Sequence, residues 1–407
     1  MLVTLVPFFD KYLKVSAYSL FSQKKNLLTN PLAQATGIND DAASIAGMEI
    51  IKAVGLDTLS PDAPVFVPVN NIAIFSNISE QCTVDHSRIV LLIDKTFPNT
   101  PQYTKRIAEL KDEGYKFAIR KLPITQFEEY REIHALMDYV IIDCKKIDVN
   151  KVKIYFSKLF PNVKMIVGNL DSSDNFAIYR NDPEFTMFEG TFYRVPVNVG
   201  DKGVSPLKTN YLELLNVVNA PDFELTKAAD IIGRDTALVV ELLKMVNRIA
   251  INSEVTSIRH AAAMLGQKEL KRWINTVVTK ELCSDKPGEI TRISLLRAKF
   301  AELLAPYFGL TVSAPELFLM GLFSVIDLIL DMPMEEALSK IKLSKQVTEA
   351  LVSRKGDFAE VLAFIEAYEN ANWQEVSRLM MIKQINNDDV YNAYVESFVW
   401  YRKLLNL

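Results

Sequence analysis

The sequence predicts a multidomain protein in which an α/β half is followed by an all-α half. Up to residue 196, short β-rich apolar runs alternate with amphipathic helical stretches, a pattern typical of βαβ units and a mainly parallel sheet. From Leu207 onward, nearly every segment has helical periodicity. Between the halves, Val197–Pro206 contains two glycines, ends in proline and has no periodicity, which indicates a linker. We therefore expect domains at residues 1–196 and 207–407, joined by a linker at 197–206.

Seven strands are expected in the first domain, because seven short runs are rich in β-branched and aromatic residues. Helices such as Thr104–Glu113, which carries Ile107 and Leu110 on one side, would cover the sheet. Strands alternating with helices in this number are consistent with a short barrel. The predicted strands are Leu2–Phe9, Lys14–Phe21, Val65–Val69, Arg88–Ile93, Lys116–Ile119, Tyr139–Ile142 and Lys164–Val167.

The second domain is a succession of predicted helices, several of which have recognisable ends. Asp235 is placed to cap a helix that runs to Ile249. Gly266 separates two helical stretches, the second of which is Glu269–Lys280. The helix that follows Asp388 has enough apolar surface to dock within the chain or in a homo-oligomer. The other predicted helices are Glu224–Ile232, Ile293–Tyr307, Glu316–Leu330, Met334–Lys340, Lys345–Val352, Glu360–Asn370 and Trp373–Met381.

The composition excludes several classes of protein. The formal net charge is −4, which provides no broad basic surface for nucleic acid. The three cysteines lie far apart, so a disulfide framework or zinc site is not expected and a reducing cytoplasm fits. The longest largely apolar run, Leu317–Ile326, is much shorter than the ~20 residues of a membrane span. We therefore expect a cytoplasmic protein without a membrane segment.

Six groups of residues in the second domain occur in a characteristic order and spacing. They are Ala229–Gly233, Leu242–Asn247, Leu265–Gly266 with Trp273, Leu296–Glu302, Phe318–Asp327 and Met332–Glu336. With this set, the helical half resembles the HDOD domain, a non-hydrolytic relative of the HD phosphohydrolases. Ser324 and Val325 stand where the HD enzymes have their metal-binding His-Asp pair. The resemblance therefore implies that this domain has lost its metal site.

The first domain resembles a diverged EAL domain, which precedes the HDOD domain in one family of bacterial signalling proteins. Val6–Asp10 and Phe188–Phe192 stand where that family has its opening and closing motifs. The resemblance implies a degenerate, shortened TIM-like barrel. It also implies descent from enzymes that hydrolyse cyclic di-GMP with two divalent cations, which prefer carboxylate and amide oxygens as ligands.

Most positions that would bind or orient those cations carry other residues in this sequence. Only Asp94, Asp143, Asp171 and Glu189 keep oxygen ligands near the implied site. The resemblance therefore implies no metal, no cofactor and no catalysis. The replaced positions are Ser19, Pro68, Leu91, Arg120 with Lys121, Ile141 and Gly168.

Arg120 and Lys121 are the candidate ligand-binding residues. They end a predicted strand, and the carboxyl ends of barrel strands face the ligand site. Two cations there could hold a phosphate or the carboxylate of a partner. The alternative interpretation is a solvated pair of loop charges.

These observations lead to a hypothesis of a non-catalytic scaffold or regulator that acts through protein–protein contacts in cyclic di-GMP-linked signalling. One alternative is a receptor that binds cyclic di-GMP or another nucleotide without cleaving it, and a second is an active phosphodiesterase with rearranged ligands. DNA binding by the helix at 236–247 is not expected, because that helix is apolar on most sides. The sequence identifies no specific partner.

Overall fold

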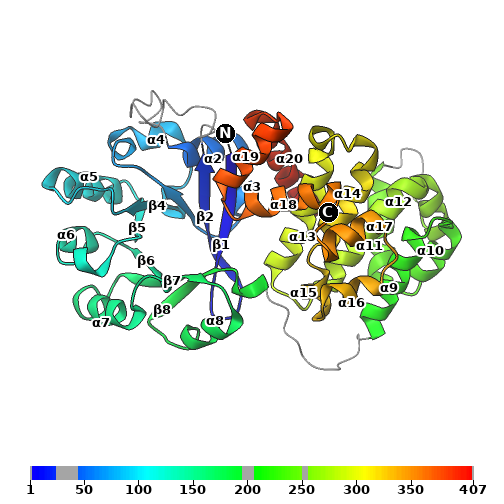
Figure 1. Ribbon diagram of the computed structural model, residues 1–407, viewed down its shortest axis with the longest axis horizontal. Coiled ribbons are helices and arrows are strands. Elements are labelled where there is room, and N and C mark those ends of the chain that lie inside the picture. The colour runs from blue at the N-terminus through cyan, green and yellow to red at the C-terminus, as the bar shows by residue number, and fades with distance from the viewer. Residues whose placement is uncertain (1, 24–44, 195–205, 250–254, 406–407) are drawn as a thin grey trace. The chain divides into compact units, whose positions relative to one another are not determined.

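The computed structural model describes residues 2–23, 45–194, 206–249 and 255–405. The chain forms two compact units, which are described separately below. The barrel unit consists of residues 1–195 together with 366–398, and the helical unit consists of residues 196–365 together with 399–407. The barrel unit has alternating strands and helices, whereas the helical unit has helices only in the part of it that the structure describes (Figure 1). The predicted combination of an α/β domain and an all-α domain is confirmed.

Eight strands close the barrel in chain order. β1 is antiparallel to both β2 and β8, and the strands from β2 to β8 run parallel to one another. Bulky apolar side chains such as Phe8, Phe66 and Ile166 fill the centre. The strands are β1 (Leu2–Phe9), β2 (Val15–Gln23), β3 (Val65–Pro68), β4 (Ile89–Asp94), β5 (Lys116–Arg120), β6 (Tyr139–Asp143), β7 (Lys164–Leu170) and β8 (Phe185–Gly190).

β8 is the one barrel strand that the sequence pattern did not predict. Its buried residues Phe185, Met187 and Phe188 do not alternate strictly, and its pairing with β7 contains register shifts. It ends at Gly190, whose φ is 152°. A Cβ atom there would lie 1.9 Å from the carbonyl oxygen of Leu170. The barrel therefore closes at a point where only glycine fits.

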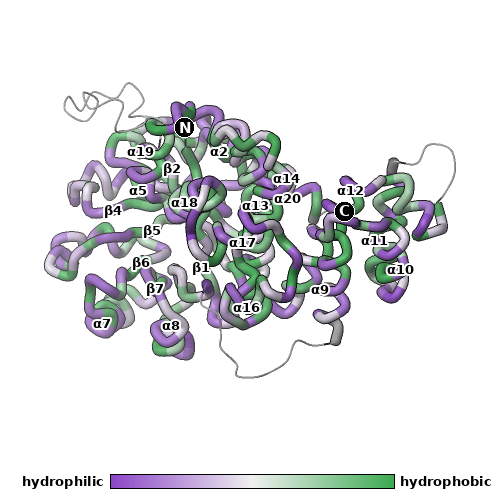
Figure 2. The backbone as a smooth tube through the Cα atoms, turned by 45° about the vertical axis from the view of Figure 1, so that its right-hand side comes forward, coloured by the Kyte–Doolittle hydropathy of each residue, from purple (hydrophilic) through white to green (hydrophobic). Residues whose placement is uncertain are grey.

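The helices of the first 195 residues lie outside the barrel (Figure 1). Along α7 and α8, hydrophilic and hydrophobic residues alternate (Figure 2), as expected for helices with one buried side. The predicted helix at Thr104–Glu113 is α5, which begins earlier because Pro101 occupies a favourable first-turn position. The helices are α2 (Ala46–Val54), α3 (Leu56–Leu59), α4 (Ile78–Gln81), α5 (Pro101–Asp112), α6 (Arg131–His134), α7 (Val149–Leu159) and α8 (Ser173–Tyr179).

His134, at the end of α6, is fully buried. The rings of Phe127, Tyr155, Phe156 and Phe160 surround it at centroid distances between 5.0 and 5.8 Å. Neither ring nitrogen has a hydrogen-bond partner. Burial lowers the pKa of His134 to about 4, because the imidazolium would lose its hydration without gaining a partner.

β1 and β2 form a ribbon that extends beyond the closed ring of strands. They pair along their whole length, but β8 pairs with only the last two residues of β1. On the other side, β3 pairs with only Tyr18 and Ser19 of β2. Among the strands that the structure describes, none lies beside the rest of the ribbon, Leu2–Val6 with Leu20–Gln23. A two-stranded ribbon is marginal by itself and needs a cover.

Residues 366–398 cover this ribbon. They comprise the end of α18 (Asp357–Glu369), all of α19 (Trp373–Lys383) and most of α20 (Asn387–Leu405). Tyr394 and Phe398, which lie on the helix after Asp388 whose apolar surface was expected to dock, are buried here. Three hydrogen bonds join these helices to the ribbon: the Val3 amide donates to Tyr368 Oη at 3.0 Å, the Thr4 and Tyr394 hydroxyls lie 3.2 Å apart, and Gln23 Nε2 donates to Ser377 Oγ at 3.3 Å.

The two compact units therefore divide the chain differently from the predicted domains. The sequence assigned all of residues 207–407 to the helical domain, but residues 366–398 belong to the barrel unit. Periodicity predicts a helix but does not identify the surface that its apolar side contacts. The predicted linker at 197–206 lies outside the described residues, except for Pro206, with which α9 begins.

The helical unit confirms the helix boundaries predicted at Asp235 and Gly266, whereas the predicted helix Glu316–Leu330 is divided into α14 and α15. Asp235 accepts hydrogen bonds from the amides of Ala237 at 2.9 Å and Leu238 at 3.2 Å, and so caps α11. Gly266 has a φ of 73° and marks a kink that divides α12 into the two predicted stretches. The helices are α9 (Pro206–Asn219), α10 (Leu225–Ile232), α11 (Thr236–Ile249), α12 (Ile258–Leu282), α13 (Gly288–Leu304), α14 (Ala314–Phe323), α15 (Ile326–Leu330), α16 (Met334–Ser339) and α17 (Lys345–Val352).

None of the helices in the described ranges combines the length and the apolar character needed to cross a membrane.

Burial of His134 predicts a loss of barrel stability in acid. Its pKa is about 4 in the folded state against an ordinary value of 6.5, so the unfolded chain binds the proton first. Stability should fall as the pH drops through this window, by about 3 kcal/mol in total. His134→Phe should remove this part of the dependence. Urea unfolding can be followed by Trp373, the one tryptophan of residues 366–398, in a variant with Trp273 and Trp400 replaced by Phe. Identical pH profiles for the two proteins would contradict the assignment.

Tyr368→Phe should destabilise the barrel unit. The change removes the acceptor of the buried Val3 amide, and an unsatisfied buried amide costs about 1–3 kcal/mol. Tyr391→Phe, on the half-buried side of α20, is the matched control and should change stability by less than about 0.5 kcal/mol. Equal losses in the two variants, measured with the same Trp373 signal, would mean that the hydrogen bond does not secure the cover.

Candidate functional site

The candidate site lies at the carboxyl ends of the parallel strands, the rim at which barrels bind ligands. Asp94 ends β4 and pairs in register with Arg120, which ends β5. Asp143 ends β6 and pairs with Gly168. Glu189 lies at the end of β8, next to Gly190. The structure therefore brings these sequence-predicted positions to one rim.

Arg120 forms the centre of this site. Its Nη2 lies 3.6 Å from Glu189 Oε1, and its guanidinium lies over the ring of Phe21 at 5.2 Å. The side chains of Arg120 and Glu189 are only 17% and 13% exposed. Burial raises the pKa of Glu189, and the charge of Arg120 opposes that shift. A guanidinium and a carboxylate therefore neutralise each other where the EAL resemblance implies metal ions.

Lys121, unlike the largely buried Arg120 beside it, points toward solvent. It is exposed, and its φ of 60° places it in the left-handed region. The sequence offered these two cations as one ligand-binding pair, but the structure brings only Arg120 into contact with Glu189 and Phe21. Two donors of Arg120, Nε and Nη1, are buried without a hydrogen-bond partner.

Gly168 makes room for this arrangement. A Cβ atom at residue 168 would lie 3.0 Å from Glu189 Oε2 and 3.2 Å from a methyl group of Ile141. A glutamate at this position, as the family has, would compete with Glu189 for the same space. The glycine at position 168 and the present position of the Glu189 carboxylate are therefore linked sterically.

The remaining acids at the rim are engaged by nearby donors. Each of the three accepts hydrogen bonds within its own loop or from the next one. Asp94 accepts from the amide and hydroxyl of Thr96 at 2.9 and 2.7 Å, Asp143 from the Lys145 amide and Asn169 Nδ2 at 3.1 Å each, and Asp171 from Lys145 Nζ at 2.8 Å and Asn175 Nδ2 at 2.7 Å. The hydrogen bond from Lys145 lowers the pKa of Asp171.

The residues at this rim do not fit two divalent cations. The most enclosed acid, Glu189, is paired with Arg120. Across the described ranges of the chain, no three His, Cys, Asp or Glu side chains come together in a way that could hold a metal ion. The pairing of Arg120 with Glu189 and the role of Phe21 were not predicted, because they join β2, β5 and β8, which are distant in sequence.

In the helical unit, an arginine contacts Ser324, which stands where the resemblance implies a lost metal-binding residue. Arg297 Nη1 donates to Ser324 Oγ at 3.1 Å, and Ser324 Oγ donates to the carbonyl of Gly321 at 2.7 Å. At Gly321 the backbones of α13 and α14 approach closely, since a Cβ atom would lie 2.4 Å from the Arg297 carbonyl oxygen. Ser324 thus joins two helices, and burial raises the pKa of the neighbouring Asp327 carboxyl.

Comparisons with known proteins identify relatives of this chain. The chain is 26% identical to the uncharacterized protein YuxH of Bacillus subtilis over 410 residues, covering 98% of each chain. It is 27% identical to the cyclic di-GMP phosphodiesterase CdgJ of Vibrio cholerae over 328 residues, covering 78% of this chain and 74% of CdgJ. Its structural neighbours are EAL domains. One is the FimX EAL domain of Pseudomonas aeruginosa bound to c-di-GMP, with a TM-score of 0.37 and 13% identity over 50% of this chain and 93% of that one.

Residues 204–356 match the HDOD domain. The match confirms the predicted HDOD resemblance of the second half, and it ends before the helices that cover the β1–β2 ribbon. The chain is therefore a multidomain protein in which an eight-stranded barrel is followed by a helical region that carries an HDOD domain.

Proposed function

We propose that this protein is a non-hydrolytic signalling protein whose barrel regulates or positions a protein partner in cyclic di-GMP-type signalling. The observation that carries the proposal is the Arg120–Glu189 ion pair at the ligand rim of the barrel. An arginine side chain there supplies a fixed positive charge. A protein partner would then contact a rim at which the charges of Arg120 and Glu189 already neutralise each other.

Electrostatics supports the absence of metal-dependent hydrolysis. A divalent cation at ~4 Å from the Arg120 guanidinium would be repelled by roughly 8 kcal/mol at an effective dielectric constant near ~20. To bind such an ion, the site would have to release Glu189 from its ion pair and move Arg120 away. The other three acids would also have to leave their present donors.

The link to cyclic di-GMP rests on the relatives. CdgJ is named a cyclic di-GMP phosphodiesterase, and the similarity to it covers most of this chain. An inactive relative of such an enzyme can keep its fold while its rim acquires new contacts, because function resides in the site and not in the fold.

A second candidate function is a receptor that binds cyclic di-GMP or another nucleotide without cleaving it. One observation favours it: Nε and Nη1 of Arg120 are donors without a partner, and arginine is well suited to bind phosphate oxygens. Such a receptor would need Arg120 to exchange Glu189 for the ligand. Calorimetric titration with cyclic di-GMP, with and without Mg²⁺, distinguishes the two candidates.

Purified protein should not hydrolyse cyclic di-GMP in the presence of Mg²⁺ or Mn²⁺. The physical reason is the lack of a carboxylate cage around a buried guanidinium. Product formation is measured by chromatography beside an authentic phosphodiesterase. Turnover that scales with protein concentration and is lost in an Asp143→Asn variant would overturn the proposal.

Arg120→Met should destabilise the barrel unit in a pH-dependent way. Removal of one partner of a fully buried ion pair costs about 3–5 kcal/mol, and the partial exposure of both side chains reduces the expected loss to about 2 kcal/mol. The pKa of Glu189 is already raised by burial and should rise further. Stability should then decline as the pH rises from the unfolded pKa of Glu189 to its folded pKa, because the unfolded state loses its proton first.

Two further variants serve as controls for this prediction. Arg120→Met combined with Glu189→Gln should recover most of the lost stability, because no unpaired charge remains. Lys121→Met, at an exposed position, should change stability by less than about 0.5 kcal/mol. A loss in Arg120→Met that is the same at pH 5 and pH 8 would show that packing on Phe21, and not charge, stabilises the site.

A further inference from the structure

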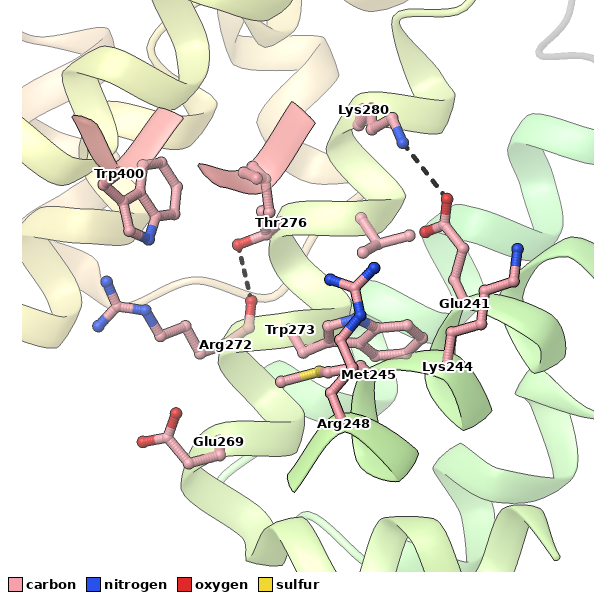
Figure 3. Close-up of a pocket in the computed structure, with 12 residues that line it drawn as sticks. Glu241, Lys244, Met245, Arg248, Glu269, Arg272, Trp273, Thr276, Lys280 and Trp400 are labelled. Carbon is pink, nitrogen blue, oxygen red and sulfur yellow. Dashed lines mark hydrogen bonds and ion pairs between the residues drawn. The ribbon is translucent and has the colours of Figure 1, made fainter. Parts of the chain in front are cut away.

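A pocket of about 300 Å³ lies within the helical unit, between α11, the second half of α12 and the last turns of α20 (Figure 3). It shares no residue with the Arg297–Ser324 contact, and the sequence motifs did not predict it. Twelve residues line it: Glu241, Lys244, Met245, Arg248, Glu269, Arg272, Trp273, Thr276, Val277, Lys280, Trp400 and Leu404.

Each helix contributes one continuous face to the pocket. The four residues of α11 are spaced by three or four positions, beginning at Glu241 and ending at Arg248. The residues of α12 follow the same spacing from Glu269 to Lys280. Residues spaced in this way lie on one side of a helix. The pocket is therefore a built feature of three facing helices.

Aromatic and apolar side chains form the walls. Trp273 is buried and Trp400 is partly exposed. Trp400 meets Phe318 edge to face, with ring centroids 5.9 Å apart, so a neighbouring ring holds it in place. Figure 3 shows Met245 near Trp273 and shows Trp400 on the other side of the pocket from α11. Tryptophan rings at such positions offer flat surfaces on which a planar ligand can stack.

The charges that line the pocket are predominantly positive, because four cations face two carboxylates. Glu241 is engaged by Lys280 at 3.3 Å. Arg272 is held by Glu302 through two bonds of 2.6 and 2.8 Å. α11 contributes the other two cations of the lining.

Lys244 and Arg248 are these two cations. They lie one turn apart on α11, and both are exposed. Figure 3 shows Lys244 on the side of the pocket away from Glu269 and shows the Arg248 guanidinium near Trp273. The pocket therefore combines cationic side chains of α11 with aromatic walls.

We propose that this pocket binds a small anion with a planar aromatic ring, of the nucleoside monophosphate class. The phosphate would contact Lys244 and Arg248, since charge-assisted hydrogen bonds to phosphate are strong. The base would lie against Trp273 and Trp400. The volume of about 300 Å³ is at the lower end of the range for small-molecule sites and is too small for a folded segment of a partner protein. The proposal rests on the helical unit alone and does not depend on the function proposed for the barrel.

Tryptophan fluorescence tests the proposal directly. Two of the three tryptophans of the chain line the pocket, so a full-length Trp373→Phe variant reports on this site alone. We expect 5′-AMP or 5′-GMP to produce a saturable change in fluorescence. Adenosine and inorganic phosphate, which each supply one half of the chemistry, should bind more weakly by about tenfold or more.

Variants of the two cations complete the test. Lys244→Ala with Arg248→Ala should weaken binding of the nucleotide by on the order of tenfold or more, with an unchanged circular dichroism spectrum. Lys268→Ala, an exposed lysine of α12 that does not line the pocket, is the matched control and should bind as the parent does. The proposal is wrong if neither nucleotide gives a saturable signal, if adenosine binds as tightly as 5′-AMP, or if the double variant retains full affinity.

Discussion

A charge enclosed in a protein must be neutralised there, and this constraint organises the ligand rim of the barrel. Arg120 is held between Glu189 and the ring of Phe21. Three strands contribute these side chains, and Gly168 leaves the space that Glu189 occupies. Replacement of Arg120 or Glu189 would leave the other charge without its partner, and a side chain at position 168 would crowd Glu189. The substitutions at the metal-binding positions are therefore mutually dependent.

In the helical unit, too, an arginine is held by hydrogen bonding at a position that the resemblance connects with metal binding. Arg297 donates to Ser324, at the position where HD enzymes have their metal-binding pair, and Gly321 lets two helices approach closely. In both units a permanent positive charge stands where the resemblances implied a metal ion. A guanidinium cannot activate water as a metal does, but it can organise hydrogen bonds and ion pairs.

The β1–β2 ribbon sets a second constraint. Because no other described strand pairs with most of it, its surface has to be covered by another part of the chain. Residues 366–398 provide that cover, with Tyr368 as the acceptor of the Val3 amide. Residues 366–398 therefore pack on the first two strands of the chain. Along the sequence, the HDOD match at residues 204–356 lies between these two segments.

The sequence by itself determined the local elements, because each depends on neighbours along the chain. Short runs rich in β-branched and aromatic residues predicted seven of the eight strands, and Asp235 and Gly266 predicted helix boundaries that the structure contains. The strand β8 was missed because Thr186, Glu189 and Gly190 leave it without a continuous apolar run. The sequence also identified Arg120 as a residue of the rim, because it ends a predicted strand and the carboxyl ends of barrel strands face the ligand site.

Only the tertiary structure decided which residues meet. The pairing of Arg120 with Glu189 joins strands whose order around the barrel had to be known first. The assignment of residues 366–398 to the barrel unit depended on which surface lacked a neighbour. The pocket lined by Trp273 and Trp400 required three helices to face one another. Periodicity shows that a helix has an apolar side, but the contacts of that side depend on the packing of segments distant in sequence.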